Sequence, residues 1–398
     1  MSDITMGEGG LSANDNLNLL KGLSVDPVEA AVKREEASAD TPTKSAPYPW
    51  ILSPKIDLLF CCGGLFWVLY LCLYLTNYKL DLSTNSPAFW LAAASVIGMH
   101  IFGDGHAPAT FFRVYFSKDT RSKLGLPVFF VFLAAIGLGL TVFYVPNAAT
   151  LALKVILAWG FQHQMAQSYG ISLIYCYKRQ YYLNKVEKLI MAGMVNATIV
   201  FMVVRMFSSP DFNLKALNGF TVPYWGVLPE WAGFVALGAL QISVLAFVGM
   251  IITRFIKTKQ MFPLPALLTI MTLILLVISA KGAFATLWWA FSTNWFHSCQ
   301  YLVVTSAFYF KEKGLPENVA FHQISKMLLT WTSFKYFGLL FSVGFTLAYL
   351  FPRFMVDHGV NAGLAFTTVY VASNFYHYIT DGFIWKLRDP QVNKLLIS

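Results

Sequence analysis

The sequence predicts an all-α fold, namely a polytopic integral membrane helical bundle with about ten transmembrane helices. Hydrophobic residues make up 57% of the 398 residues and charged residues only 12%, which is unlike a soluble globular domain. Apolar runs of roughly 20 residues, the length that an α-helix needs to cross the hydrocarbon, recur from Asp57 onward. Basic residues gather in alternate connections between these runs, as the positive-inside rule predicts for cytoplasmic loops.

The apolar runs and the connections between them predict the topology. The runs lie near residues 57–77, 87–112, 126–145, 149–176, 187–207, 231–253, 264–281, 284–310, 332–352 and 362–386. Basic residues follow the second, fourth, sixth and eighth runs: Arg113, Lys118, Arg121, Lys123; Lys178, Arg179, Lys185, Lys188; Arg254, Lys257, Lys259; and Lys311, Lys313, Lys326. We therefore expect a multi-pass protein with both termini in the cytoplasm, in a bacterial-type inner membrane or an internal membrane.

The N-terminal region differs from the rest in composition. Residues 1–49 hold 8 of the 20 acidic residues but only 4 of the 29 basic ones. Residues 1–46 also lack aromatic side chains and cannot bury enough apolar surface to offset the entropy of ordering. We expect a disordered acidic cytoplasmic tail at 1–46, with one short helix near 26–37, and a transmembrane helical domain at 47–398. The positive-inside rule explains why the rest of the chain has more basic than acidic residues. We therefore predict no nucleic-acid partner.

Histidine is the residue type that brings chemistry into the predicted spans. Five of the seven histidines lie there, namely His100, His106, His163, His297 and His377, and the carboxylates well inside are Asp104 and Asp381. Ionisable residues in a bilayer are costly and usually face an interior cavity. His100, His163 and His297 each lie 13 to 15 residues before the next basic residue on the cytoplasmic side, so we expect them at the same depth in the membrane. His106 and His377 fall one to two turns nearer the cytoplasm by the same count.

Each of these histidines except His106 is followed, three or four residues later, by an amide or carboxylate side chain. They are Asp104 after His100, Gln167 after His163, Gln300 after His297 and Asp381 after His377. Residues three or four apart share a helix face, and metal sites in bundles combine inward-facing histidines and carboxylates with orienting polar groups. We predict His100, His106, His163, His297, His377, Asp104 and Asp381 as metal ligands, with Gln167 and Gln300 as cofactor-binding residues that orient them.

Arg113 lies seven residues beyond His106, on the same helix face and near the membrane surface. It is a candidate for binding an anionic lipid or the head group of a substrate or cofactor. The alternative interpretation is a positive-inside anchor with no ligand.

The histidine pattern favours a membrane-embedded, metal-dependent oxidoreductase or oxygenase that acts on a lipophilic small molecule. Iron in a mononuclear or dinuclear centre is the expected cofactor, and the expected partners are membrane lipid, the lipophilic molecule and an electron donor. Three alternatives are open: electron transfer through haem b, proton-coupled transport by the same histidines and aspartates, and a structural or assembly role. The sequence singles out no catalytic residue.

Overall fold

The described part of the chain is helical apart from one pair of two-residue strands. The computed structural model describes residues 48–75, 93, 97–210, 216–217, 220–221, 224–279 and 293–397. The predicted tail at 1–46 and its short helix lie outside the described residues. The two strands pair antiparallel, with Ala216 opposite Thr221.

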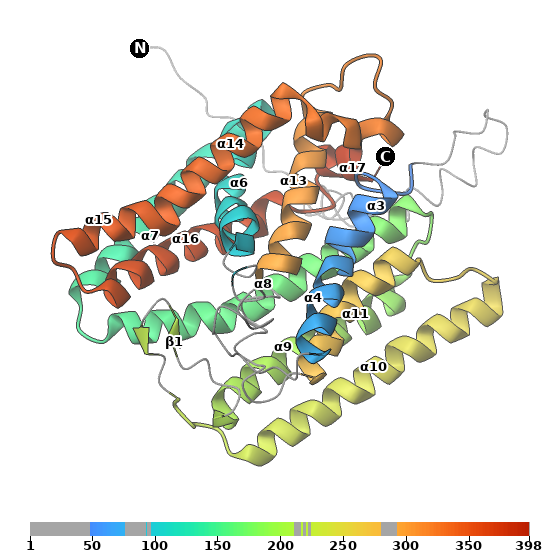
Figure 1. Cartoon of the computed structure of the whole chain (residues 1–398). Helices are drawn as coiled ribbons and strands as arrows, with labels where there is room; N and C mark the ends of the chain where they lie inside the picture. Colours follow the sequence, from blue (N-terminus) through green and yellow to red (C-terminus); the bar gives the residue numbers. More distant parts are fainter. Residues whose placement is uncertain are drawn as a thin grey trace, which may run out of the picture. The chain divides into compact units, whose positions relative to one another are not determined.

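The elements follow one another along the chain as labelled in Figure 1. They are α3 (Pro54–Ile56), η1 (Asp57–Cys61), α4 (Gly64–Leu75), η2 (Met99–Gly103), α6 (Asp104–Tyr115), α7 (Lys118–Tyr144), α8 (Ala148–Lys178), α9 (Lys185–Ser208), β1 (Ala216–Leu217), β2 (Phe220–Thr221), α10 (Glu230–Thr258), α11 (Leu264–Ser279), η4 (Thr293–Ser298), α13 (Cys299–Glu312), η5 (Phe321–Leu329), α14 (Trp331–Phe345), η6 (Thr346–Leu350), α15 (Phe351–Asp357), α16 (Ala362–Ile384) and α17 (Pro390–Leu396).

Polar residues at the helix starts explain several of these boundaries. The Ser117 hydroxyl accepts a hydrogen bond from the Thr120 backbone N–H and so caps α7. Asn184 and Glu187 form a reciprocal capping box at the start of α9. The Asn361 side chain caps α16 in the same way as the serine caps α7. Each cap satisfies a backbone donor that the first helical turn leaves free.

Several helices are long and apolar enough to span a membrane. Within the described residues these are α7, α9, α10 and the continuous helix Trp331–Asp357, whose mean hydropathies run from 1.6 to 2.4. The pair Pro54–Cys61 and Gly64–Leu71, which is bent by 51°, makes a fifth if its two parts form one span. This is fewer than ten, although each of the ten predicted runs overlaps a described helix. The helix α8 has 31 residues but falls outside this group, because it carries polar side chains along its buried face.

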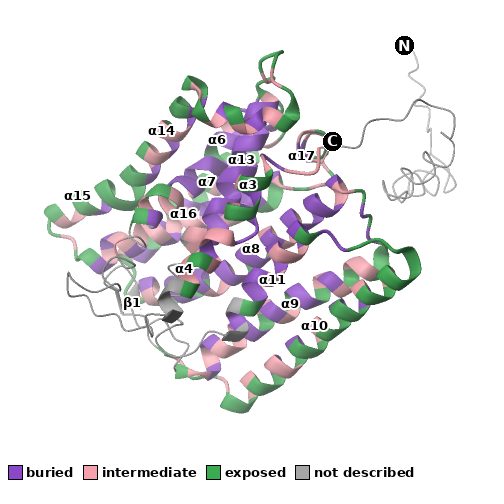
Figure 2. Ribbon diagram, turned by 45° about the vertical axis from the view of Figure 1, so that its right-hand side comes forward, coloured by how far each residue is buried: buried purple, intermediate pink, exposed green. Residues whose placement is uncertain are grey.

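The helices of the bundle differ in burial. In Figure 2 the helices α6, α8, α11 and α13 are mainly buried, whereas α10, α14 and α15 are largely exposed. The helix α16 packs against α6, α7 and α8, and α13 packs against α6. The exposed face of α10 is apolar, with Phe234 73% and Ile242 70% exposed. Large apolar side chains on an outer face are what lipid contact requires.

Glycine sets the shape of the bundle at two positions. Gly63 has a φ of +85° at the bend between η1 and α4, a conformation that other residues rarely adopt. Gly344 lets α14 approach α6 so closely that a Cβ atom there would overlap the Asp104 backbone carbonyl. Such close approach of small residues is a common way for membrane helices to pack.

Candidate metal centre

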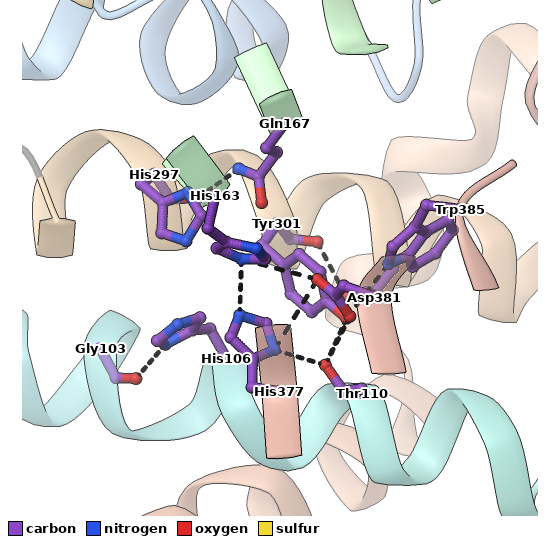
Figure 3. A network of polar contacts seen from close by, with 11 residues as sticks. Gly103, His106, Thr110, His163, Gln167, His297, Tyr301, His377, Asp381 and Trp385 are labelled. Carbon is purple, nitrogen blue, oxygen red and sulfur yellow. Dashed lines mark hydrogen bonds and ion pairs between the residues drawn. The ribbon is translucent and has the colours of Figure 1, made fainter. Parts of the chain in front are cut away.

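Four buried histidines from four helical segments meet inside the bundle (Figure 3). His106 lies on α6, His163 on α8, His297 on η4 and His377 on α16, and none is more than 8% exposed. Two of these segments include or follow a π-helical turn, since η4 contains His297 and η2 immediately precedes α6. Such turns change the direction in which later side chains point and occur frequently at functional sites.

The imidazole rings lie at distances that fit a shared ion. The ring centroids are 4.6 Å apart for His163 and His377, 4.8 Å for His106 and His377, and 5.1 Å for His163 and His297. His106 and His297 are 5.5 Å apart, and His297 and His377 are 6.4 Å apart. When a metal–nitrogen bond is about 2.1 Å long, the centroid of the imidazole ring lies about 3.2 Å from the metal. Two rings bound at right angles around the metal then have centroids about 4.6 Å apart, and two rings on opposite sides of it have centroids about 6.5 Å apart.

The possible ligand atoms form two overlapping groups. His106, His297 and His377 make one, and His163, His377 and Asp381 make the other, with the ligand atoms of each group within 4.8 Å of one another. The Nε2 atoms of His163 and His377 are only 3.0 Å apart. That separation suits two ligands of one ion, and it equally suits a single N–H···N hydrogen bond.

Asp381 is held next to these rings by hydroxyl groups. Its Oδ1 atom accepts hydrogen bonds from the Thr110 hydroxyl at 2.9 Å and from the Tyr301 hydroxyl at 2.8 Å. The Trp385 indole N–H donates to the Tyr301 hydroxyl at 3.2 Å. The other carboxylate oxygen, Oδ2, lies 3.8 Å from His163 Nε2 and 3.7 Å from His377 Nδ1. One oxygen is therefore fixed and the other faces the histidines.

Hydrogen bonds at Nδ1 orient two of the imidazoles. His106 Nδ1 donates to the Gly103 backbone carbonyl, which leaves its Nε2 atom as the possible metal ligand. The Thr110 hydroxyl lies 2.7 Å from His377 Nδ1, 2.9 Å from Asp381 Oδ1 and 2.6 Å from the Tyr301 hydroxyl. A second hydrogen bond of this kind fixes the orientation of a metal-binding imidazole.

His297 is held through its backbone. The Gln167 side-chain amide donates to the His297 carbonyl at 2.8 Å and to the Gln300 amide oxygen at 3.2 Å. Gln300 in turn donates to the Cys61 carbonyl at 2.8 Å. The His297 Nδ1 atom itself is buried and has no hydrogen-bond partner among the described residues. Buried polar atoms normally have a partner, so this nitrogen needs an explanation, and a bound ion would supply one.

The predicted ligands His100 and Asp104 lie outside this cluster. His100 Nδ1 and Asp104 Oδ2 are 2.7 Å apart, and the His100 side chain is 34% exposed. The His100 ring contacts Phe345 and Tyr349. The structure therefore joins His106, rather than His100, to the other three histidines. Counting residues to the next basic side chain gives depth only to within a turn, and His100 lies within a π-helical turn whereas His106 lies beyond it.

Arg113, the remaining predicted residue, is buried at 7% exposure. Its guanidinium stacks 3.6 Å above the Phe308 ring and donates to the Thr120 hydroxyl. It belongs to a separate cavity and not to the group of ligand atoms.

Sequence reasoning did not assign the two hydroxyl residues that orient the cluster. Thr110 lies four residues after His106, and Tyr301 lies four residues after His297. Both hydroxyl residues have the helical spacing from a histidine that Asp104 and Asp381 also have, so this spacing is a signal for them as well. Tyr378, whose ring stacks 4.4 Å from that of His163, follows His377 directly and had no such signal.

Comparisons with known proteins give no further guidance. No protein-family model, no curated protein and no solved structure matches the chain.

Proposed function

We propose that the chain is a membrane-embedded, metal-dependent oxidoreductase or oxygenase acting on a lipophilic molecule. A single metal ion would be bound by His106, His163, His297 and His377, with Asp381 as a further ligand or a hydrogen-bonding partner. The observation that carries the proposal is that five ring separations of 4.6 to 6.4 Å link the four imidazoles, and that their ligand atoms form two groups of three that share His377.

The donor set supports a first-row transition metal. Imidazole nitrogen suits iron, copper, nickel and zinc, and the added carboxylate favours iron among the metals that carry out oxygen chemistry. When bound, such an ion would supply redox chemistry and a position for oxygen or substrate. The residues of this chain would hold the ion, keep the rings oriented through Thr110 and Gly103, and keep bulk water out.

One ion fits the geometry better than two. His377 belongs to both groups of possible ligands, but its Nδ1 atom is occupied by Thr110. Only Nε2 is available, so the two groups compete for the same nitrogen. The mononuclear centre is therefore the better supported of the two forms that the sequence predicted.

The ring packing also favours a non-haem ion over haem b. Axial ligands on opposite sides of a haem iron would lie about 4 Å apart with a porphyrin plane between them. The His163 and His377 nitrogens are 3.0 Å apart, and the rings of His106 and His297 pack against the same pair. No porphyrin plane fits between these two nitrogens.

The surroundings of the cluster support a lipophilic substrate. The four histidines lie inside a bundle whose outer helices are apolar and long enough for a bilayer. A molecule dissolved in the membrane can approach from the side, whereas a polar one would have to cross apolar packing. We further propose that all ten predicted runs span the membrane with both termini in the cytoplasm, where an electron donor would reach the protein.

Elemental analysis of the detergent-purified chain tests the proposal. We expect near-stoichiometric metal in the wild type and almost none after His163→Ala or His297→Ala, because each change removes one ligand. His322→Ala is the matched control, since His322 is exposed and distant in sequence from all four ligands. Wild-type protein without metal, or ligand variants that retain full metal, would overturn the proposal.

An optical spectrum of the same samples separates the alternatives. A Soret band would establish haem b instead of a non-haem ion. Metal-free protein whose histidine variants lose proton-driven uptake of a solute would establish the transporter.

A further inference from the structure

A second polar site lies at the ends of four helices, and none of the four clustered histidines lines it. It is a cavity of about 240 Å³ formed where α6 ends, α7 begins, and the chain leaves α16 to enter α17. Its polar lining residues are Arg113, Thr120, Lys123, Lys386, Arg388, Asp389 and Gln391.

The lining carries an excess of positive charge. Four cationic side chains face one carboxylate, that of Asp389. This carboxylate already accepts hydrogen bonds from the Gln391 and Val392 backbone N–H groups, at 2.9 and 3.2 Å, where it caps α17. The nearby Glu312 carboxylate accepts from the Gln391 side chain at 2.8 Å and from Ser117. Both acidic groups are therefore engaged by other donors.

Arg113 is the buried cation of this cavity. Only 7% of it is exposed, its Nε–H has no hydrogen-bond partner, and it forms no ion pair with another described residue. Aromatic rings cover its faces, with the guanidinium carbon 3.6 Å from the Phe308 centroid and 5.5 Å from the Trp385 centroid. The Glu312 and Asp389 carboxylates attract this charge, but neither forms an ion pair with it, and the cavity leaves room for an anion beside it.

We propose that this cavity binds a phosphate group. Arginine and lysine are the side chains that bind phosphate, and the guanidinium fork matches its oxygens. A carboxylate would carry one negative charge against four cations, whereas a phosphomonoester carries about 1.5 to 2 at neutral pH. The location at helix ends is where phospholipid head groups lie, so the phosphate belongs either to an anionic lipid or to a soluble ion. The proposal does not depend on the metal centre.

Calorimetric titration of the full-length protein in detergent tests the site with three probes. They are a short-chain phosphatidic acid, inorganic phosphate, and the matching diacylglycerol, which lacks the phosphate. We expect phosphatidic acid to bind with a stoichiometry near one and diacylglycerol not to bind. Equal affinity for inorganic phosphate would identify a soluble phosphate as the ligand, and its failure to bind would identify the lipid.

Substitutions of residues that line the cavity test whether phosphate binds there. Arg113→Gln should weaken phosphate binding by about tenfold or more, because charge-assisted hydrogen bonds are lost. Lys386→Gln is the second variant, because this exposed side chain can change without disturbing the fold. Arg121→Gln is the matched control, since Arg121 is an exposed arginine of α7 that does not line the cavity.

The results overturn the proposal in two cases. In the first, the wild type binds neither phosphate probe. In the second, Arg113→Gln and Lys386→Gln both bind as tightly as Arg121→Gln. Metal content measured on the same variants should equal that of the wild type, so failure here is distinguishable from failure of the metal proposal.

Discussion

Two histidine–aspartate pairs with identical spacing have different surroundings in this protein. His100 and Asp104 form a contact of 2.7 Å, and the histidine side chain is one-third exposed. His377 is fully buried, its ring nitrogen lies 3.7 Å from Asp381, and three more imidazoles surround it. In the first pair the histidine and the aspartate contact each other, whereas in the second pair both residues also lie beside other possible metal ligands. Spacing along one helix therefore identifies a pair, and only the neighbouring helices decide whether that pair belongs to a larger site.

The largest difference between the pairs is expected on removal of the histidine. His377→Ala should lower metal affinity by more than about 100-fold, because His377 belongs to both ligand groups and even the loss of an orienting residue costs about 10–100-fold. Metal bound per folded chain, measured after dialysis against a weak chelator, gives the result. Full occupancy of this variant would contradict the central position assigned to His377.

The second largest difference in metal affinity is expected between substitutions of the two aspartates. Asp381→Asn keeps the shape but removes the negative charge beside His163 and His377, so we expect metal affinity to fall by about 10–100-fold. Asp104→Asn should leave metal affinity unchanged, because Asp104 contacts only His100 among the histidines. Competition with a coloured chelator measures both. Equal effects of the two substitutions would remove the distinction drawn between the pairs.

A smaller effect is expected from the hydroxyl that orients His377. Thr110→Val preserves volume but removes the hydroxyl that contacts His377 Nδ1 and Asp381, so we expect about a tenfold loss of metal affinity. Thr141→Val is a suitable control, since this exposed hydroxyl bonds only to the Gly137 carbonyl of its own helix. Excess metal should restore occupancy in the Thr110 variant, and failure to do so would indicate a collapsed site.

The smallest effect is expected from His100→Ala. The His100 side chain is 34% exposed but that of Asp104 only 7%, so removing the imidazole leaves a buried carboxylate without this partner, which costs about 1–3 kcal/mol. Metal content should equal that of the wild type, and the melting temperature should change by only a few degrees. A loss of metal here would show that His100 reaches the cluster after all.

The helices and the meeting of three histidines could be predicted from the sequence, but which further histidine joins them could not. Apolar run length pointed to a helical bundle, and His163, His297 and His377 were all expected as ligands of one site; their rings lie 4.6 to 6.4 Å apart. The choice between His100 and His106 depended on local helix geometry, because His100 lies in the π-helical turn Met99–Gly103 and His106 lies beyond it. A pattern with the period of a regular helix contains no information about such a turn.

The phosphate cavity lies further from what a sequence can show. The sequence makes Arg113 a candidate for contacting an anion, but its burial beneath Phe308 depends on how α6 and α13 pack. Lys386 and Arg388 join it from the far end of the chain for the same reason. Side chains that meet only through the packing of distant helices leave no spacing signal.

The distance in sequence between the clustered residues has a consequence for biogenesis. Thr110 and Asp381 touch although they are 271 positions apart, and His163 and His377 are 214 positions apart. If α6 and α8 span the membrane as proposed, they enter it before α16 has been made. Their imidazoles would then remain in the bilayer, or beside the insertion machinery, until α16 arrives. Loading of an ion would therefore be a late event that locks early and late helices together, and a ribosome stalled before α16 would release a chain unable to retain metal.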